Sequence, residues 1–130
     1  MDKAQILYGA AYSLYEQGDY SAAIPLFTEL LLSHPFCIHY WKGLASAEQM
    51  NKNYTAALHA WCLVVLLDNQ NPKPHFHAAE CYLSLNQTED ALKALDAAEK
   101  HLNLESSEDH HLKTQIDLLK ASMGGCATYV

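Results

Sequence analysis

The chain has 130 residues, half of them apolar, and its 15 acidic residues against 8 lysines give a net charge of −7. This length and composition predict one folded domain and exclude wholesale disorder. The acidic charge, with no arginine in the chain, argues against a nucleic-acid partner, and the apolar run Trp61–Leu67 is too short to cross a bilayer. With no basic segment leading into an apolar one at the N-terminus, we expect a cytoplasmic protein.

Three segments align without a gap at a spacing of 34 residues, over about 4–37, 38–71 and 72–105. Small residues recur at fixed points of this repeat: its eighth residue is Ala11, Ala45 or Ala79, and its twentieth is Ala23, Ala57 or Ala91. Bulky residues recur at others, such as Phe27, Trp61 and Leu95. Because two helices approach closely only where one side chain is small, the pattern predicts stacked helix pairs.

In chain order, the pattern predicts helices over 4–17, 21–34, 38–51, 55–68, 72–86 and 88–102. Gly18 supplies a positive φ at the first turn within a pair, and Ser21 is expected to cap the helix that follows. A last helix over 107–123 places Leu112, Ile116 and Leu119 on one stripe, as expected of a helix that closes the end of a stack. These features match the tetratricopeptide repeat. The sequence therefore predicts an all-α solenoid of three repeats and a capping helix, in a single domain over 1–130.

In such a stack, the first helix of each pair lines the concave side, and its second, fifth, ninth and twelfth repeat positions face a groove. We expect these positions to bind a peptide through Gln5, Tyr8, Tyr12 and Tyr15 in the first repeat, Lys42 and Ser46 in the second, and Lys73, Phe76 and Leu83 in the third. Apolar at both ends and polar between, this groove would fit an extended peptide with spaced hydrophobic side chains. Two alternatives stay open: the tyrosines could be covered by the termini or packed between repeats, and Phe76 could have a purely core role.

No catalytic residue, metal site or cofactor is expected. His77 and Cys81 could share a helix face, but no third ligand has an obvious place. The four cysteines are scattered without zinc or disulfide spacing, and Cys62 and Cys81 are expected to pack as small hydrophobic residues.

Three stretches resemble one known family more specifically: residues 7–20, residues 40–45 and, above all, residues 72–83 with the run Phe76-His77-Ala78-Ala79-Glu80-Cys81. They are similar to the class II type III secretion chaperones, the bacterial cytosolic chaperones of translocator proteins. The resemblance implies a non-enzymatic virulence chaperone that holds an extended N-terminal segment of a hydrophobic translocator in its groove and keeps it soluble. It assigns Tyr8, Tyr12, Tyr15 and Phe76 to that contact. Family members carry further helices ahead of the first repeat for dimerisation. Here the first repeat begins almost at Met1, so a homodimer is left open.

A second function class also fits the repeats. A generic scaffold would join two folded partners in a bacterial assembly or regulatory complex. A scaffold's partners should be soluble without it, whereas a translocator should be insoluble when expressed alone.

Overall fold

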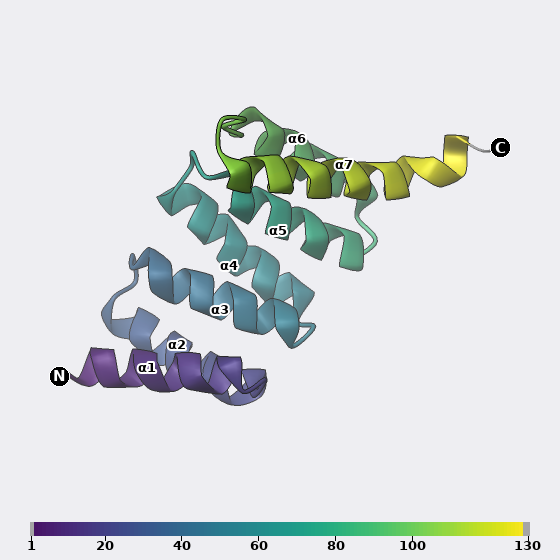
Figure 1. Cartoon of the computed structure of the whole chain (residues 1–130). Coiled ribbons are helices and arrows are strands. Elements are labelled where there is room, and N and C mark those ends of the chain that lie inside the picture. Colours follow the sequence, from purple (N-terminus) through teal and green to yellow (C-terminus); the bar gives the residue numbers. More distant parts are fainter. Residues whose placement is uncertain (1, 129–130) are drawn as a thin grey trace. The chain divides into compact units, whose positions relative to one another are not determined.

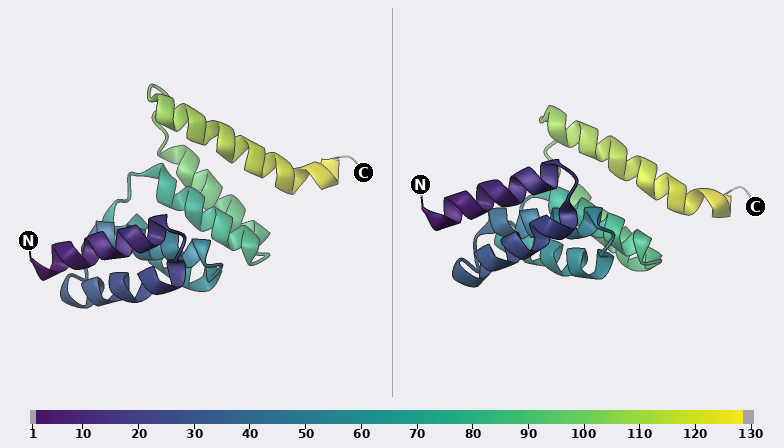
Figure 2. Two further views of the ribbon diagram at one scale, coloured as in Figure 1. Left: turned by 60° about the horizontal axis from the view of Figure 1, so that its bottom comes forward. Right: turned by 90° about the horizontal axis from the view of Figure 1, so that it is seen from below.

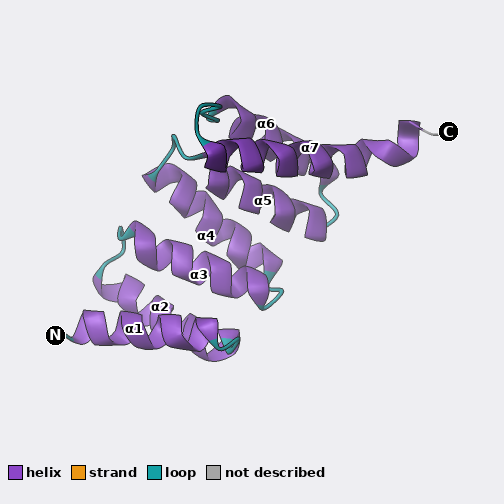
Figure 3. Ribbon diagram, in the orientation of Figure 1, coloured by secondary structure: helices purple, strands orange, loops and turns teal. Residues whose placement is uncertain are grey.

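The structure, a computed structural model, describes residues 2–128, with side chains for residues 2–123. This part of the chain contains helices and connecting turns and no strand (Figures 1 and 3). The helices are α1 (Lys3–Glu16), α2 (Tyr20–Ser33), α3 (Ile38–Met50), α4 (Tyr54–Leu67), α5 (Pro72–Ser84), α6 (Thr88–Lys100) and α7 (Ser107–Thr128).

The first six helices begin and end within two residues of their predicted bounds, which confirms the all-α repeat fold. The seventh differs, because α7 continues to Thr128 rather than ending at 123. The prediction ended this helix at Met123, just before Gly124 and Gly125. Glycine in a helix costs about 1 kcal/mol relative to alanine, which weakens a helix without stopping it.

The same turn joins the two helices of every repeat. Gly18, Lys52 and Asn86, which occupy the same position in successive repeats, have left-handed φ angles of 82°, 64° and 62°. The next amide then donates to a carbonyl five residues back: Asp19 to Leu14 at 2.9 Å, Asn53 to Glu48 at 2.9 Å and Gln87 to Tyr82 at 2.8 Å. This pattern satisfies carbonyls at the helix end, and it confirms the positive φ predicted at Gly18.

The predicted cap of the second helix was wrong. The N-cap of α2 is Asp19, whose carboxylate accepts a hydrogen bond from the amide of Ala22 at 3.3 Å. Because α2 begins at Tyr20, Ser21 lies inside the first turn, and its hydroxyl instead donates to Asn51 Oδ1 at 3.4 Å.

The chain divides into two compact units, unit 1 over Met1–Asp68 and unit 2 over Asn69–Val130. Unit 1 contains the helix pairs α1–α2 and α3–α4, and unit 2 contains α5, α6 and α7. The expectation of a single domain over 1–130 stays a prediction.

The recurring small residues lie in the core, as predicted. All six alanines at the eighth and twentieth repeat positions are 0% exposed. The bulky residues Phe27 and Leu95 are also fully buried, and Trp61 is 5% exposed. Cys81 is buried as expected, but Cys62 is exposed. Helix α4 carries apolar residues on all sides, so its sequence does not identify the buried stripe that excludes Cys62.

Helix α7 packs on the α5–α6 pair of unit 2. Leu112 and Ile116 join a core cluster with Phe76, Ala79, Leu95 and Ala98, which confirms the predicted stripe. With 22 residues against 13 in α6, α7 extends past its neighbours at its C-terminal end (Figures 1 and 2).

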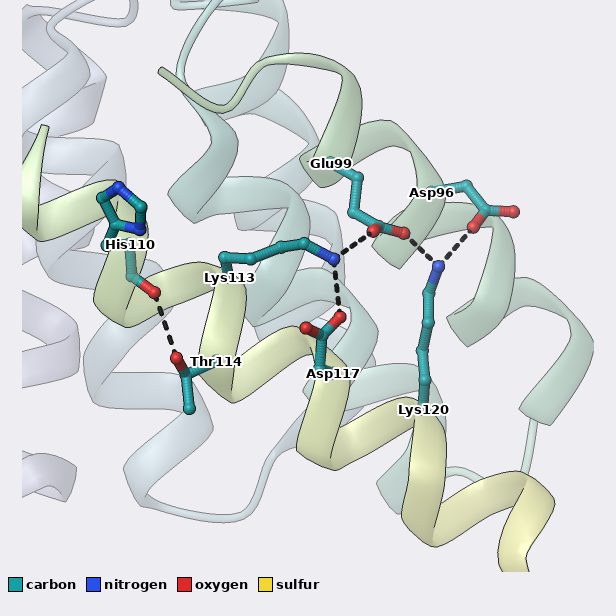
Figure 4. A network of polar contacts seen from close by, with 7 residues as sticks. All are labelled: Asp96, Glu99, His110, Lys113, Thr114, Asp117 and Lys120. Carbon is teal, nitrogen blue, oxygen red and sulfur yellow. Dashed lines mark hydrogen bonds and ion pairs between the residues drawn. The ribbon is translucent and has the colours of Figure 1, made fainter. Parts of the chain in front are cut away.

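Two lysines connect α7 to α6 (Figure 4). Lys120 pairs with Glu99, and its Nζ also lies 2.7 Å from Asp96 Oδ1. Lys113 Nζ lies 3.1 Å from Glu99 Oε2 and 2.7 Å from Asp117 Oδ1. Hydrogen bonds from the two lysines hold the pKa of Glu99 below its ordinary value. The charged side of α7 therefore helps to hold α7 against α6, in addition to facing solvent.

Within residues 2–128, no helix combines the length and the apolar character needed to span a membrane.

Candidate functional site

The three tyrosines predicted on α1 form one aromatic cluster in unit 1. The ring centroids of Tyr8 and Tyr12 lie 5.0 Å apart, and those of Tyr12 and Tyr15 lie 6.3 Å apart. Both contacts are edge-to-face, the geometry that aromatic rings prefer. Tyr12 is 38% exposed, while Tyr8 and Tyr15 are half-buried. None of the three rings is sealed inside the molecule, so all three retain surface that a ligand can cover.

Aromatic residues from the neighbouring helices hold this cluster in place. Tyr40 of α3 lies 5.2 Å from Tyr8, and Tyr20 of α2 lies 5.3 Å from Tyr15, between ring centroids. We call the surface formed by Tyr8, Tyr12, Tyr15, Tyr20 and Tyr40 the tyrosine face. Each ring is braced by another, so little side-chain freedom is left to lose when a ligand binds.

A hollow of about 100 Å³ opens beside the tyrosine face. It is lined by Tyr12 and Tyr15 of α1, Phe27 of α2, and Gly43 and Ser46 of α3. Sites for drug-sized molecules are roughly 300–1,000 Å³, so this volume suits one aliphatic side chain rather than a whole small molecule. The hollow therefore has the size and the lining expected of a subsite for one side chain of a peptide.

Phe27 and Gly43 form the inner wall of that hollow by close contact. A Cβ atom added at Gly43 would lie only 2.3–2.8 Å from three carbons of the Phe27 ring. Phe27 is 0% exposed, and its ring centroid lies 5.9 Å from that of Tyr12. The Phe27 ring thus occupies the space that a side chain at position 43 would need.

The phenol groups of Tyr8 and Tyr15 are held in their neutral, hydrogen-bonding form. Burial, together with a hydrogen bond to Tyr12, raises the pKa of Tyr8 well above its ordinary value. Burial also raises the pKa of Tyr15, against a smaller opposing effect of its hydrogen bond with Ser46. Protonated phenols can donate to peptide carbonyls, so the site offers apolar edges and polar tips together.

Three predicted residues of unit 1 lie outside the hollow: Tyr8, which belongs to the tyrosine face, and Gln5 and Lys42. Gln5 is exposed, and its side chain completes a capping box with Asp2: Gln5 Oε1 accepts from the Asp2 amide at 3.0 Å, and the Gln5 amide donates to Asp2 Oδ1 at 2.8 Å. Lys42 is half-buried on α3. Of the unit 1 predictions, Tyr12, Tyr15 and Ser46 are the ones that line the hollow.

The predicted residues of the third repeat lie in unit 2. Phe76 is only 7% exposed, because it packs in the core cluster with Leu112 and Ile116 of α7. One edge of Phe76 still borders a larger hollow, which Lys73 also lines. Leu83 is half-buried on α5 and does not line this hollow.

Sequence reasoning missed Tyr20, Tyr40, Phe27 and Gly43 as members of the site. Phe27 stands at a repeat position that had been assigned to packing, and Tyr20 and Tyr40 stand outside the four groove positions. Glycine stands at the same repeat position in Gly9 and Gly43, but only Gly43 is buried. The sequence alone does not show this difference in burial, so it gave no signal for the hollow.

Among the described residues, no group of three His, Cys, Asp or Glu side chains is arranged to hold a metal ion. His77 Nδ1 instead lies 2.8 Å from Glu80 Oε1, one turn along the same helix.

Residues 8–74 match the tetratricopeptide repeat family, and residues 75–101 match a second description of the same repeat. The low calcium response locus protein H of Yersinia pestis is 28% identical over 115 residues, which cover 88% of this chain and 68% of that protein. A chain of the CopN–Scc3 complex is 30% identical, with a TM-score of 0.83, over 89% of this chain and 68% of that one.

The chain is also similar to the Yersinia enterocolitica type III secretion chaperone SycD, solved in complex with a peptide of the translocator YopD. Identity is 26% and the TM-score is 0.82, over 90% of this chain and 88% of SycD. The chain belongs to the tetratricopeptide repeat family and is homologous to the SycD-type chaperones of type III secretion translocators.

Proposed function

We propose that this protein is a type III secretion chaperone of the bacterial cytoplasm, which binds an extended hydrophobic segment of a translocator and keeps it soluble until secretion. It acts by binding alone, without a catalytic step or a cofactor. The observation that carries the proposal is the half-exposed tyrosine face beside a hollow sized for one side chain.

Folding alone gives little reason to leave this aromatic surface open. Tyr12 packs on Phe27, yet more than a third of its surface is left exposed. Exposed, rigid tyrosines are typical anchors of binding surfaces, since each brings a large contact area at a low entropic cost. A guest with an aliphatic side chain in the hollow would place its backbone near the phenol hydroxyls.

The relatives point to the same class of guest. SycD was solved with a translocator peptide, and it is similar to this chain over most of both lengths. We assign the guest contact in unit 1 to Tyr8, Tyr12, Tyr15 and Ser46, with Gln5 and Lys42 at its margins. Lys73, Leu83 and the open edge of Phe76 are the corresponding candidates in unit 2.

Co-expression tests this function directly. A candidate translocator is expressed alone, with the wild-type chain, and with the Tyr12→Ala/Tyr15→Ala variant, and its soluble fraction is measured. We expect the translocator to be insoluble alone, soluble with the wild-type chain, and largely insoluble with the variant. A partner that is soluble under all three conditions would instead favour the generic scaffold.

A further inference from the structure

A hollow of unit 2 lies between α5 and α7 and has a volume of about 370 Å³. Lys73, Phe76, His77 and Glu80 line it from α5, and Glu108, His111, Leu112 and Gln115 line it from α7. Phe76 and Leu112, 7% and 4% exposed, form an apolar floor, and the other six residues form a polar rim.

The place of this hollow in the repeat matches that of the hollow in unit 1. Leu112 stands one full repeat length after Ala78, so α7 continues the repeat as the first helix of a further pair. The unit 1 hollow lies between the first helices α1 and α3, and the unit 2 hollow lies between the first helices α5 and α7. On the α5 side, Lys73, Phe76 and Glu80 line the hollow from the second, fifth and ninth repeat positions, which the repeat pattern predicts to contact a guest.

The rim carries an excess of negative charge. It has two carboxylates and one lysine: Glu108 is paired with Lys73, and Glu80 Oε1 lies 2.8 Å from His77 Nδ1. The side chains of Lys73 and Glu108 are 46% and 64% exposed, and exposed pairs of this kind are weak enough to exchange partners. The whole chain adds a net charge of −7, which attracts cations.

We propose that the α5–α7 hollow is a subsite for a cationic side chain, a guanidinium or an ammonium on an aliphatic stem. The stem lies on Phe76 and Leu112, and the charged head reaches Glu80 and Glu108 at the rim. Flat guanidinium groups also stack on the imidazole and phenyl rings that His77 and Phe76 provide. The inference rests on the proposed function only for the source of the side chain, which is a basic residue of the guest polypeptide.

A titration followed by NMR tests the subsite without any translocator. The ¹⁵N-labelled full chain is titrated with N-acetyl-arginine amide and, separately, with N-acetyl-citrulline amide, a neutral compound of nearly the same shape. We expect saturable shifts at amides of α5 and α7, with arginine binding about fivefold tighter than citrulline because a charge-assisted contact is lost. Raising the salt concentration should reduce this preference.

Matched variants decide whether the rim is responsible. Glu80→Gln and Glu108→Gln should each reduce the arginine preference, whereas Glu89→Gln should keep it, because Glu89 lies in the first turn of α6 and does not line the hollow. Equal affinity for arginine and citrulline, shifts confined to other helices, or an equal effect of Glu89→Gln would each overturn the proposal. A failed co-expression would remove the translocator as guest while leaving this titration unchanged, so the two failures are distinguishable.

Discussion

Gly43 offers a sharp test of how the tyrosine face is built. In Gly43→Ala, the new methyl group would lie 2.3–2.8 Å from the Phe27 ring, well inside van der Waals contact. Phe27 has little room to retreat, because it is fully buried and packs against both Tyr8 and Tyr12. The methyl group should therefore force a shift of the rings that wall the hollow.

A matched variant isolates the size of this effect. Gly9 stands at the same position of the preceding repeat, and a Cβ added there meets nothing within 4 Å. Alanine favours the helix over glycine by about 1 kcal/mol, and this gain in the free energy of unfolding applies at both positions. Overpacking a core costs about 1–3 kcal/mol, so Gly43→Ala should be less stable than Gly9→Ala by that amount.

Denaturant unfolding followed by tryptophan fluorescence measures this difference, because both tryptophans, Trp41 and Trp61, lie in unit 1. Gly9→Ala should raise the free energy of unfolding above that of the wild type, and Gly43→Ala should not. If the two variants are equally stabilised, the close contact between Phe27 and Gly43 is not what holds the wall of the hollow.

Two further predictions concern the helix contacts. The lysines of α7 hold the pKa of Glu99 below its ordinary 4.5. The ion pairs of Glu99 therefore stabilise the α6–α7 contact fully above pH 4.5. This stabilisation is lost as the pH falls through the lowered pKa of Glu99. At pH 7, Glu99→Gln should speed amide exchange in α7, measured by mass spectrometry, whereas Glu89→Gln should not; equal exchange in both variants would contradict this. Ala45→Leu in unit 1 and Ala79→Leu in unit 2, both at fully buried sites, should each lower stability by about 1–3 kcal/mol in thermal melts. A wild-type melting temperature in either would mean that the repeat register is wrong.

The helices and their turns could be predicted because the same types of residue recur at the same positions in three successive repeats. Ala11, Ala45 and Ala79 must be small wherever two helices cross closely, and one copy of such a pattern would have been weak. The left-handed residue of the first turn was predicted because it is a glycine, Gly18, whereas the same conformation at Lys52 and Asn86 was not predicted. Spacing along a helix also predicted correctly that Tyr8, Tyr12 and Tyr15 share a face.

Burial could not be predicted with the same success, since it depends on which helix lies opposite. Phe76 occupies a groove position by its spacing, yet the docking of Leu112 and Ile116 from α7 covers it. Cys62 lies in a helix that is apolar all round, and the pattern therefore gave no direction for its side chain. The hollow beside Tyr12 depends on the fit of Phe27 against Gly43, which only the three-dimensional arrangement of α2 and α3 reveals.

The central claim, that the tyrosine face holds a guest polypeptide, is tested most directly by the affinity of the solubilised translocator for two variants of the chain. Isothermal titration should give at least about tenfold weaker binding to Tyr12→Ala/Tyr15→Ala than to the wild type. Leu32→Ala should bind as the wild type does, because Leu32 is 81% exposed on α2, outside the tyrosine face. Equal affinity of the double variant and the wild type, with both folded by fluorescence, would contradict the claim.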